Sequence, residues 1–143
     1  MASNKRLKLL LAEDDPDDQV LIRDAIDLTG ITSNIDIVED GESLIESLLR
    51  KDEDRPDVVL LDLNMPKTDG REALKKIRRH PQIKDIPVFV LTTSTDQKDI
   101  IMCSQLGVKA YITKPNSFAE LVEVLETISR YWSSIVGFST GSN

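Results

Sequence analysis

Apolar residues in this chain form short blocks that alternate with longer segments of mixed apolar and polar residues. The blocks are rich in Val, Ile and Leu and lie at residues 7–12, 34–38, 58–61, 87–91 and 109–113. After each block, apolar residues recur at the three- and four-residue spacing of an amphipathic helix. Short apolar strands that alternate with helices predict an α/β fold, in which helices cover both faces of a parallel sheet.

Turn and cap residues indicate where the helices should begin and end. Pro16 suits the first turn of the first helix, and Gly30 suits its C-terminal end. Asp96 could cap the fourth helix, and Asn116 or Ser117 could cap the fifth. These signals predict five helices that follow the five strands in strict alternation.

The fifth helix carries more apolar residues than one buried stripe needs. One continuous line should face the sheet and comprises Phe118, Leu121, Val122, Leu125, Ile128 and Trp132. Val124 and Tyr131 lie on a neighbouring line and could form an exposed patch, which usually marks a partner surface. The tail at residues 133–143 is rich in Ser and Gly, and we expect it to fray or to dock at a dimer interface.

The block at residues 58–61 organises the rest of the chain. Its four apolar residues, two of them β-branched, predict a strand that is buried on both faces. The block ends at Asp62, and Asn64, Pro66 and Gly70 then supply turn residues. Asp62 is therefore expected at the carboxyl end of a central strand, the edge where open α/β sheets bind ligands. We interpret Asp62 as a phosphate acceptor.

Polar side chains follow four of the predicted strands and could meet at that same edge. Glu13 and Asp14 follow the first strand, Asp62 the third, Thr92 the fourth and Lys114 the fifth. Three carboxylates in one pocket repel one another unless a cation compensates them. An all-oxygen ligand set favours Mg²⁺. Lys114 and the Thr92 hydroxyl could reach a phosphate, since both can donate hydrogen bonds to its oxygens.

Each of these residues also has an ordinary structural explanation. An Asp after an apolar strand is more often a turn former than a nucleophile. An acidic run such as residues 13–18 is usually a solvated helix start. Thr is common at strand ends, and a Lys-Pro pair can be simply a loop. The functional interpretation is favoured because all of them fall at successive strand ends on one edge of the sheet.

Composition narrows the function classes. The chain has 143 residues, 40% of them hydrophobic and 30% charged, which suits one globular domain. A net charge of −7 and a pI of about 4.7 disfavour nucleic acid or an anionic membrane as partner. The single cysteine, Cys103, allows no internal disulfide and fits a reducing cytoplasm. No segment has the length of a signal core or a membrane span.

The combined motifs resemble the receiver domain of two-component response regulators. The matching residues are Glu13 and Asp14, Asp62 within Leu-Leu-Asp-Leu-Asn-Met-Pro, Asp69 and Gly70, Thr92, and Lys114 and Pro115. The resemblance covers a domain at residues 5–132. It implies a flavodoxin-like (βα)5 three-layer sandwich with parallel strands in the order 2-1-3-4-5.

The resemblance also implies a chemistry. Asp62 would accept a phosphoryl group from a phosphohistidine of a histidine kinase or a phosphotransfer protein. Mg²⁺ would be held by Asp14, Asp62 and the main-chain carbonyl of Asn64, with Glu13 acting through a water molecule. Lys114 would contact the phosphoryl group.

A switch and a subtype are implied in the same way. The phosphoryl group would draw Thr92 inward, and Tyr111, at the aromatic position used as a rotamer switch, would follow. Thr93 could bear on the rate of hydrolysis. The chain looks like the small stand-alone bacterial receivers paired with phytochrome-type kinases, which tend to dimerise. We expect Tyr111, Val124 and Tyr131 at a twofold interface formed by the fourth helix, fifth strand and fifth helix.

Two other functions would share part of this residue pattern. A haloacid-dehalogenase-type phosphatase also uses a strand-end Asp and Mg²⁺, but it needs a second Asp two residues later as acid and base. That position is Asn64, which cannot transfer the proton. A degenerate receiver that acts only as a binding surface would lack the acceptor or a metal ligand, and no such residue is missing.

Overall fold

The computed structural model describes residues 7–31, 34–50 and 55–141, with side chains as far as residue 134. The strands are β1 (Lys8–Ala12), β2 (Asn34–Val38), β3 (Val58–Leu61), β4 (Val88–Thr92) and β5 (Ala110–Thr113). The helices are α1 (Pro16–Thr29), α2 (Gly41–Leu48), α3 (Gly70–Arg79), α4 (Gln97–Gln105) and α5 (Phe118–Gly141).

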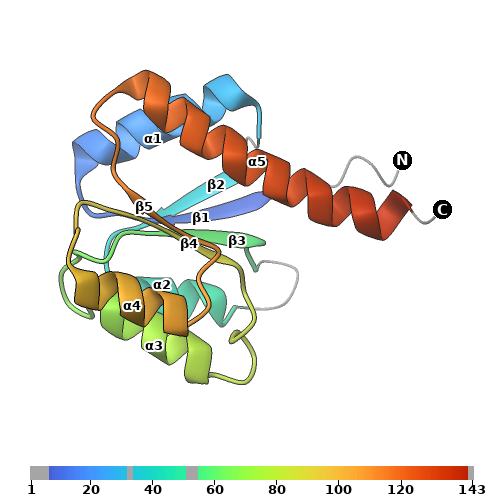
Figure 1. Ribbon diagram of the computed structural model, residues 1–143. Coiled ribbons are helices and arrows are strands. Elements are labelled where there is room, and N and C mark those ends of the chain that lie inside the picture. Colours follow the sequence, from blue (N-terminus) through green and yellow to red (C-terminus); the bar gives the residue numbers. More distant parts are fainter. Residues whose placement is uncertain (1–6, 32–33, 51–54, 142–143) are drawn as a thin grey trace.

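The sheet is parallel and its strands run in the order β2-β1-β3-β4-β5. Figure 1 shows α1 and α5 on one side of the sheet, and α2, α3 and α4 on the other. The predicted three-layer flavodoxin-like architecture and strand order are therefore confirmed. Central strands need apolar residues on both faces in such a fold, and every residue of β3 and β4 is buried.

Two apolar clusters hold the layers together. Leu44, Leu74, Ile77 and Cys103 from α2, α3 and α4 pack on one face of the sheet. Ile22, Ile26, Leu121, Leu125 and Ile128 from α1 and α5 pack on the other face. Burying each of the Leu and Ile side chains contributes roughly 1.5–3 kcal/mol, so the helices are held mainly by these stripes.

The register of the parallel strands brings their carboxyl ends to one edge. Ala12 of β1 is paired with Leu61 of β3, and Leu61 is paired with Val90 of β4. Beyond the ladder, the N–H of Asp62 donates to the carbonyl of Ala12 at 3.0 Å, and the N–H of Lys114 donates to the carbonyl of Thr92 at 2.8 Å. The residues that follow these strands are thus neighbours.

Helix ends follow the predicted caps. Gly30 ends α1 in the left-handed conformation, with φ 68°, and Asp96 caps α4 by accepting from the N–H of Lys98. At α5 the cap is Ser117, whose hydroxyl accepts from the N–H of Glu120 and donates to its carboxylate, both at 3.1 Å.

The fifth helix differs from the prediction in its length and in two side chains. It runs to Gly141 and projects past the other elements in Figure 1, so residues 133–141 are helical and not a frayed tail. Ser and Gly weaken a helix there, but no proline breaks it. Phe118 is 41% exposed because the buried stripe begins one turn later, at Leu121. Tyr131 is half-buried and packs edge-to-face on Phe89, with ring centroids 5.3 Å apart.

Candidate functional site

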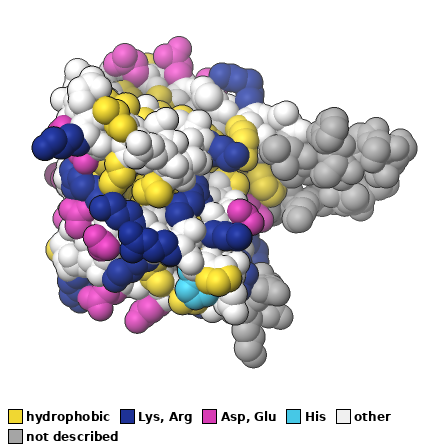
Figure 2. All heavy atoms as spheres, turned by 60° about the horizontal axis from the view of Figure 1, so that its bottom comes forward, with side chains coloured by type: hydrophobic (Ala, Val, Ile, Leu, Met, Phe, Trp, Pro, Cys, Tyr) yellow, Lys and Arg dark blue, Asp and Glu magenta, His cyan; other side chains and the backbone are white. Residues whose placement is uncertain are grey.

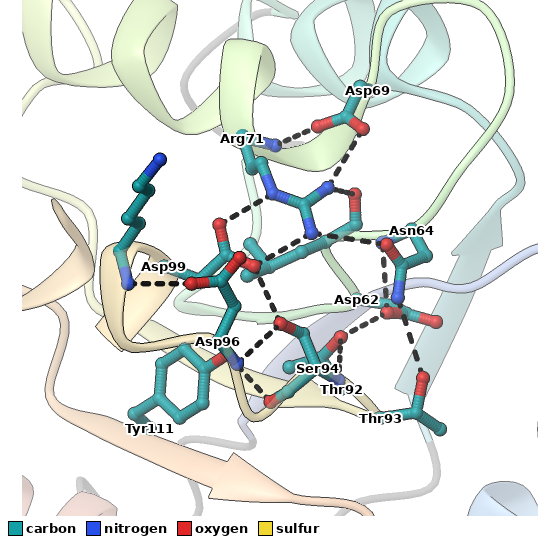
Figure 3. Close-up of polar contacts among 12 residues, drawn as sticks. Asp62, Asn64, Asp69, Arg71, Thr92, Thr93, Ser94, Asp96, Asp99 and Tyr111 are labelled. Atoms are coloured by element: carbon teal, nitrogen blue, oxygen red, sulfur yellow. Dashed lines mark hydrogen bonds and ion pairs between the residues drawn. The ribbon is translucent and has the colours of Figure 1, made fainter. Parts of the chain in front are cut away.

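Asp62 lies directly after β3 with only 5% of its surface exposed. Its Oδ1 accepts a hydrogen bond from the Thr92 hydroxyl at 2.8 Å and another from the backbone N–H of Asn64 at 3.0 Å. Its Oδ2 lies 3.0 Å from the Lys114 Nζ. Residues at the carboxyl ends of three neighbouring strands therefore converge on one carboxylate, as Figure 3 shows for Asn64 and Thr92.

Lys114 is the cation of this cluster. Its Nζ lies 2.7 Å from Glu13 Oε1, 2.7 Å from Asp18 Oδ2 and 3.0 Å from Asp62 Oδ2. Burial opposes the charge of Lys114, but its hydrogen bonds to Asp18, Glu13 and Asp62 outweigh burial and raise the pKa of the ammonium. From their place deeper in the acidic helix start, Asp17 and Asp18 are expected to be solvated. For Asp18 that expectation is wrong, because Asp18 lies in the first turn of α1 and turns toward Lys114.

Three carboxylates lie together beside this lysine and form a candidate cation site. Oxygen atoms of Glu13, Asp14 and Asp62 all lie within 4.8 Å of one another. Burial raises the pKa of Glu13, although its bond to Lys114 works in the opposite direction. A hard divalent cation prefers carboxylate oxygens and would relieve the repulsion that remains. The donor set of these residues thus fits Mg²⁺.

The predicted switch residues lie around the adjoining β4–α4 loop, with Thr92 at the end of β4, Thr93 on the loop and Tyr111 on β5. Tyr111 of β5 donates from its hydroxyl to the backbone carbonyl of Ser94 at 2.9 Å. The Ser94 N–H approaches the Thr92 hydroxyl oxygen at 3.4 Å. Thr93 is exposed, and its hydroxyl oxygen accepts from the Asn64 side chain at 3.4 Å. A short series of hydrogen bonds therefore connects Asp62 with Tyr111.

The structure adds two residues that the sequence analysis did not select, Arg71 and Asp99. The Arg71 guanidinium binds both carboxylate oxygens of Asp99, at 2.7 and 2.8 Å, beside the Asp62 pocket (Figure 3). Hydrogen bonds to Asp99 raise the pKa of Arg71, and those from Arg71 lower the pKa of Asp99. Charged residues on two amphipathic helices are ordinary, and 28 residues separate them. No local sequence signal distinguishes this pair.

The loop between Asp62 and α3 packs closely against the end of β3. Asp69 caps the helix by accepting from the Arg71 N–H, and the Gly70 N–H donates to the Leu63 carbonyl at 3.0 Å. A Cβ on Gly70 would lie 2.3 Å from the carbonyl oxygen of Asp62. Only glycine lets the start of α3 come this close to the strand end.

A different hollow lies at the amino ends of β4 and β5, the edge opposite to Asp62. It has a volume of about 410 Å³ and is lined by residues that include Arg78, Lys84 and Lys109. Figure 2 shows Lys and Arg side chains over the face that carries α3 and α4, with acidic side chains between them. Arg78 donates to the carbonyls of Leu106 and Ile86, at 2.6 and 2.9 Å, so it joins α3 to the end of α4 and to the loop before β4.

Among residues 7–31, 34–50 and 55–141, no helix combines the length and apolar character needed to cross a bilayer.

Comparison with known proteins gives concordant matches. Residues 9–126 match the family model described as the response regulator receiver domain. The response regulator Rcp1 of Synechocystis sp. is 36% identical over 138 residues, which are 94% of each chain.

Two solved structures are similar over most of their length. The phosphorylated cyanobacterial phytochrome response regulator RcpA is 37% identical with a TM-score of 0.81, and the alignment covers 92% of this chain and 96% of RcpA. The Mn²⁺-bound form of Rcp1 is 36% identical with a TM-score of 0.78, covering 88% and 94%.

Proposed function

This chain belongs to the response regulator receiver domain family, and we propose that Asp62 accepts a phosphoryl group from a phosphohistidine in a Mg²⁺-dependent reaction. The observation that carries the proposal is the environment of the Asp62 carboxylate. It contacts the Lys114 ammonium and the Thr92 hydroxyl, and two further carboxylates lie within 4.8 Å. A buried nucleophile, two donors for phosphoryl oxygens and a cation site thus lie together.

In the proposed transfer, an oxygen of the Asp62 carboxylate attacks phosphorus and forms a P–O bond. The P–N bond to the donor histidine breaks, and its electron pair stays on the imidazole nitrogen. Lys114 already binds Asp62 Oδ2 and is therefore placed to balance the added negative charge. The Thr92 hydroxyl, which donates to Asp62 Oδ1, is placed to turn toward a phosphoryl oxygen.

Glu13, Asp14 and Asp62 are the side chains that would hold the metal, with Glu13 acting through water and the Asn64 carbonyl as a further ligand. When bound, Mg²⁺ neutralises charge on the carboxylates and on the transferring oxygens. The related Rcp1 has a Mn²⁺-bound form, which supports a divalent ion in this chain as well.

We propose that the signal is read on the face formed by α4, β5 and α5. Movement of Thr92 would disturb Ser94, and Ser94 accepts the hydrogen bond of Tyr111. Thr93 lies next to both groups and is a candidate for setting the rate of hydrolysis. A histidine kinase is the proposed donor, and a phytochrome-type kinase is supported by the likeness to RcpA, described as a phytochrome response regulator.

A twofold dimer through the same face is part of this proposal. Tyr111 and Val124 are half-buried on this face within the single chain, so part of each remains available to a partner. Tyr131 is also half-buried, but its ring already packs on Phe89. Val124 is therefore the better of the two α5 positions for testing the interface.

The test is direct chemical mapping of the phosphorylated residue. With Mg²⁺ and acetyl phosphate, the wild type should gain one acid-stable, base-labile phosphoryl group, which peptide mapping by mass spectrometry places on Asp62. Asp62→Asn should gain none. The control is Asp57→Asn, which changes a carboxylate at the other end of β3 and should leave labelling intact. A phosphopeptide at any other residue of the wild type would overturn the proposal.

A further inference from the structure

Every donor of the Arg71 guanidinium has an acceptor at the rim of the Asp62 pocket. Nε and Nη2 bind the two carboxylate oxygens of Asp99, at 2.7 and 2.8 Å. Nη2 also donates to Asn64 Oδ1 at 3.2 Å, and Nη1 donates to Asp69 Oδ2 at 3.0 Å and the Leu63 carbonyl at 3.4 Å. A guanidinium has five N–H groups, so the group is fixed from α4 on one side and from the β3–α3 loop on the other.

Asp99 holds the Arg71 guanidinium in place through both of its carboxylate oxygens. Its side chain is in the first turn of α4 and the residue is 7% exposed. Besides Arg71, its Oδ2 accepts from the Ser94 hydroxyl at 2.6 Å, and Ser94 in turn accepts from Tyr111 through its carbonyl. Because Asp99 accepts two parallel bonds from Arg71 and a third from Ser94, the orientation of the Arg71 guanidinium is well defined.

Asn64 is the exposed residue that Arg71 contacts on the β3–α3 loop. It is exposed, lies two residues after Asp62, and its backbone N–H binds Asp62 Oδ1. Its amide oxygen accepts from Arg71, while its amide nitrogen donates to the Thr93 hydroxyl oxygen. The amide thus spans the loops after β3 and β4, beside the acceptor carboxylate (Figure 3). Without Arg71, an exposed side chain with one bond of 3.4 Å would sample other rotamers.

We infer that Arg71 is a positioning residue: held by Asp99, it fixes the Asn64 amide beside Asp62 and so lengthens the lifetime of a phosphoryl group there. The inference rests on the proposed function. In hydrolysis a water oxygen attacks phosphorus, the P–O bond to Asp62 breaks with its electrons staying on the carboxylate, and the oxygen and both protons of the water leave in inorganic phosphate. An amide held across to Thr93 restricts the approach of that water.

Arg71→Lys is the informative variant. Lysine keeps the positive charge and can still pair with Asp99, but a single ammonium cannot make the parallel bonds to Asp99 and also hold Asn64. The matched control is Arg78→Lys, the same substitution in the same helix, which breaks comparable bonds at the opposite edge of the sheet. Thermal unfolding of both variants reports any general loss of stability.

The lifetime is measured as the decay of wild-type and variant acyl phosphate after removal of the donor. Arg71→Lys should shorten the half-life roughly two- to tenfold, the range expected for one hydrogen bond, and Arg78→Lys should leave it unchanged. Asn64→Ala, which alters an exposed side chain and should fold normally, should shorten it to a similar extent. Arg71→Lys should add nothing in the Asn64→Ala background, since both act through the same amide.

A second readout needs no phosphoryl group. The side-chain NH₂ resonances of Asn64, assigned by their loss in Asn64→Ala, should shift in Arg71→Lys and stay in place in Arg78→Lys. Unshifted resonances, additive effects in the double variant or an unchanged lifetime in Asn64→Ala would each overturn the inference. A wild type that takes no phosphoryl group would overturn the proposed function and the lifetime role together, whereas the resonances test the positioning of Asn64 by itself.

Discussion

Replacing Gly70 by alanine should displace the backbone that carries Asp62. The added Cβ would lie 2.3 Å from the Asp62 carbonyl oxygen and 2.7 Å from the Leu63 Cα, where ordinary contact begins at 3.4 Å. Both atoms belong to the backbone, so no side chain can rotate away to make room. The start of α3 and the end of β3 must therefore separate by roughly 1 Å, which is a case of overpacking.

We expect Gly70→Ala to lower both the free energy of unfolding and the rate of Asp62 phosphorylation. Overpacking of this kind typically costs about 1–3 kcal/mol in the free energy of unfolding. A misplacement of about 1 Å at a reacting group can lower a rate on the order of 100-fold, because the attacking oxygen leaves its aligned position. We expect the initial rate of Asp62 phosphorylation by acetyl phosphate to fall on the order of 10–100-fold in Gly70→Ala, as measured by mass spectrometry.

Gly107→Ala is the matched control. Gly107 has φ +70° and open space around the position of a Cβ, so alanine there strains the backbone by about 1–2 kcal/mol without a collision. Gly107 lies at the opposite edge of the sheet. The rate of Asp62 phosphorylation in Gly107→Ala should therefore stay within about twofold of the wild-type rate. A Gly70→Ala protein with wild-type stability and rate, or an equal loss of rate in both variants, would refute the steric argument.

Three further predictions concern the metal, the dimer and acid stability. Asp14→Asn should weaken Mg²⁺ binding on the order of 10–100-fold by calorimetry, and the exposed Asp17→Asn much less; equal losses would indicate a diffuse acidic patch. Val124→Asp should shift a dimer toward monomer in sedimentation velocity, and a wild type that is monomeric with and without beryllofluoride would rule the dimer out. Since the pKa of Asp99 is lowered in the folded state, its ion pair stabilises the protein fully above about pH 4 and less as the pH falls below that. Urea unfolding at pH 7 and pH 3 should therefore show a smaller pH dependence for Asp99→Asn, and an identical dependence would contradict this assignment.

The layers of the fold could be predicted from the sequence because they depend on local and periodic signals. The block at residues 58–61 is apolar throughout, which is what a strand covered on both faces requires. Gly30 and Asp96 mark helix ends through their own backbone and side-chain preferences. The length of α5 was missed because Ser and Gly at residues 133–141 lower helix propensity without excluding a helix, so composition alone does not fix the end.

Some residues of the site could likewise be predicted from the sequence, and others could not. Asp62, Thr92 and Lys114 could be selected because each lies at or just after the carboxyl end of a strand, and parallel strands bring these ends to one edge however the helices pack. Asp18 was assigned to solvent because an acidic helix start is normally solvated, and only the position of Lys114 in space reverses that assignment.

Arg71 and Asp99 show where sequence reasoning stops. Each lies in the first turn of a helix, where an Arg is unremarkable and an Asp is favoured by the helix dipole, so neither position carries an anomaly. Their bond depends on how α3 and α4 pack on the sheet, and that is decided by the apolar cluster of Leu74, Ile77 and Cys103. The place of the Asp62 carboxylate is therefore specified by topology, whereas the residues that position its surroundings are specified by tertiary packing. Substitutions in that cluster should accordingly alter the geometry of the Arg71–Asp99 pair before they alter the strand ends.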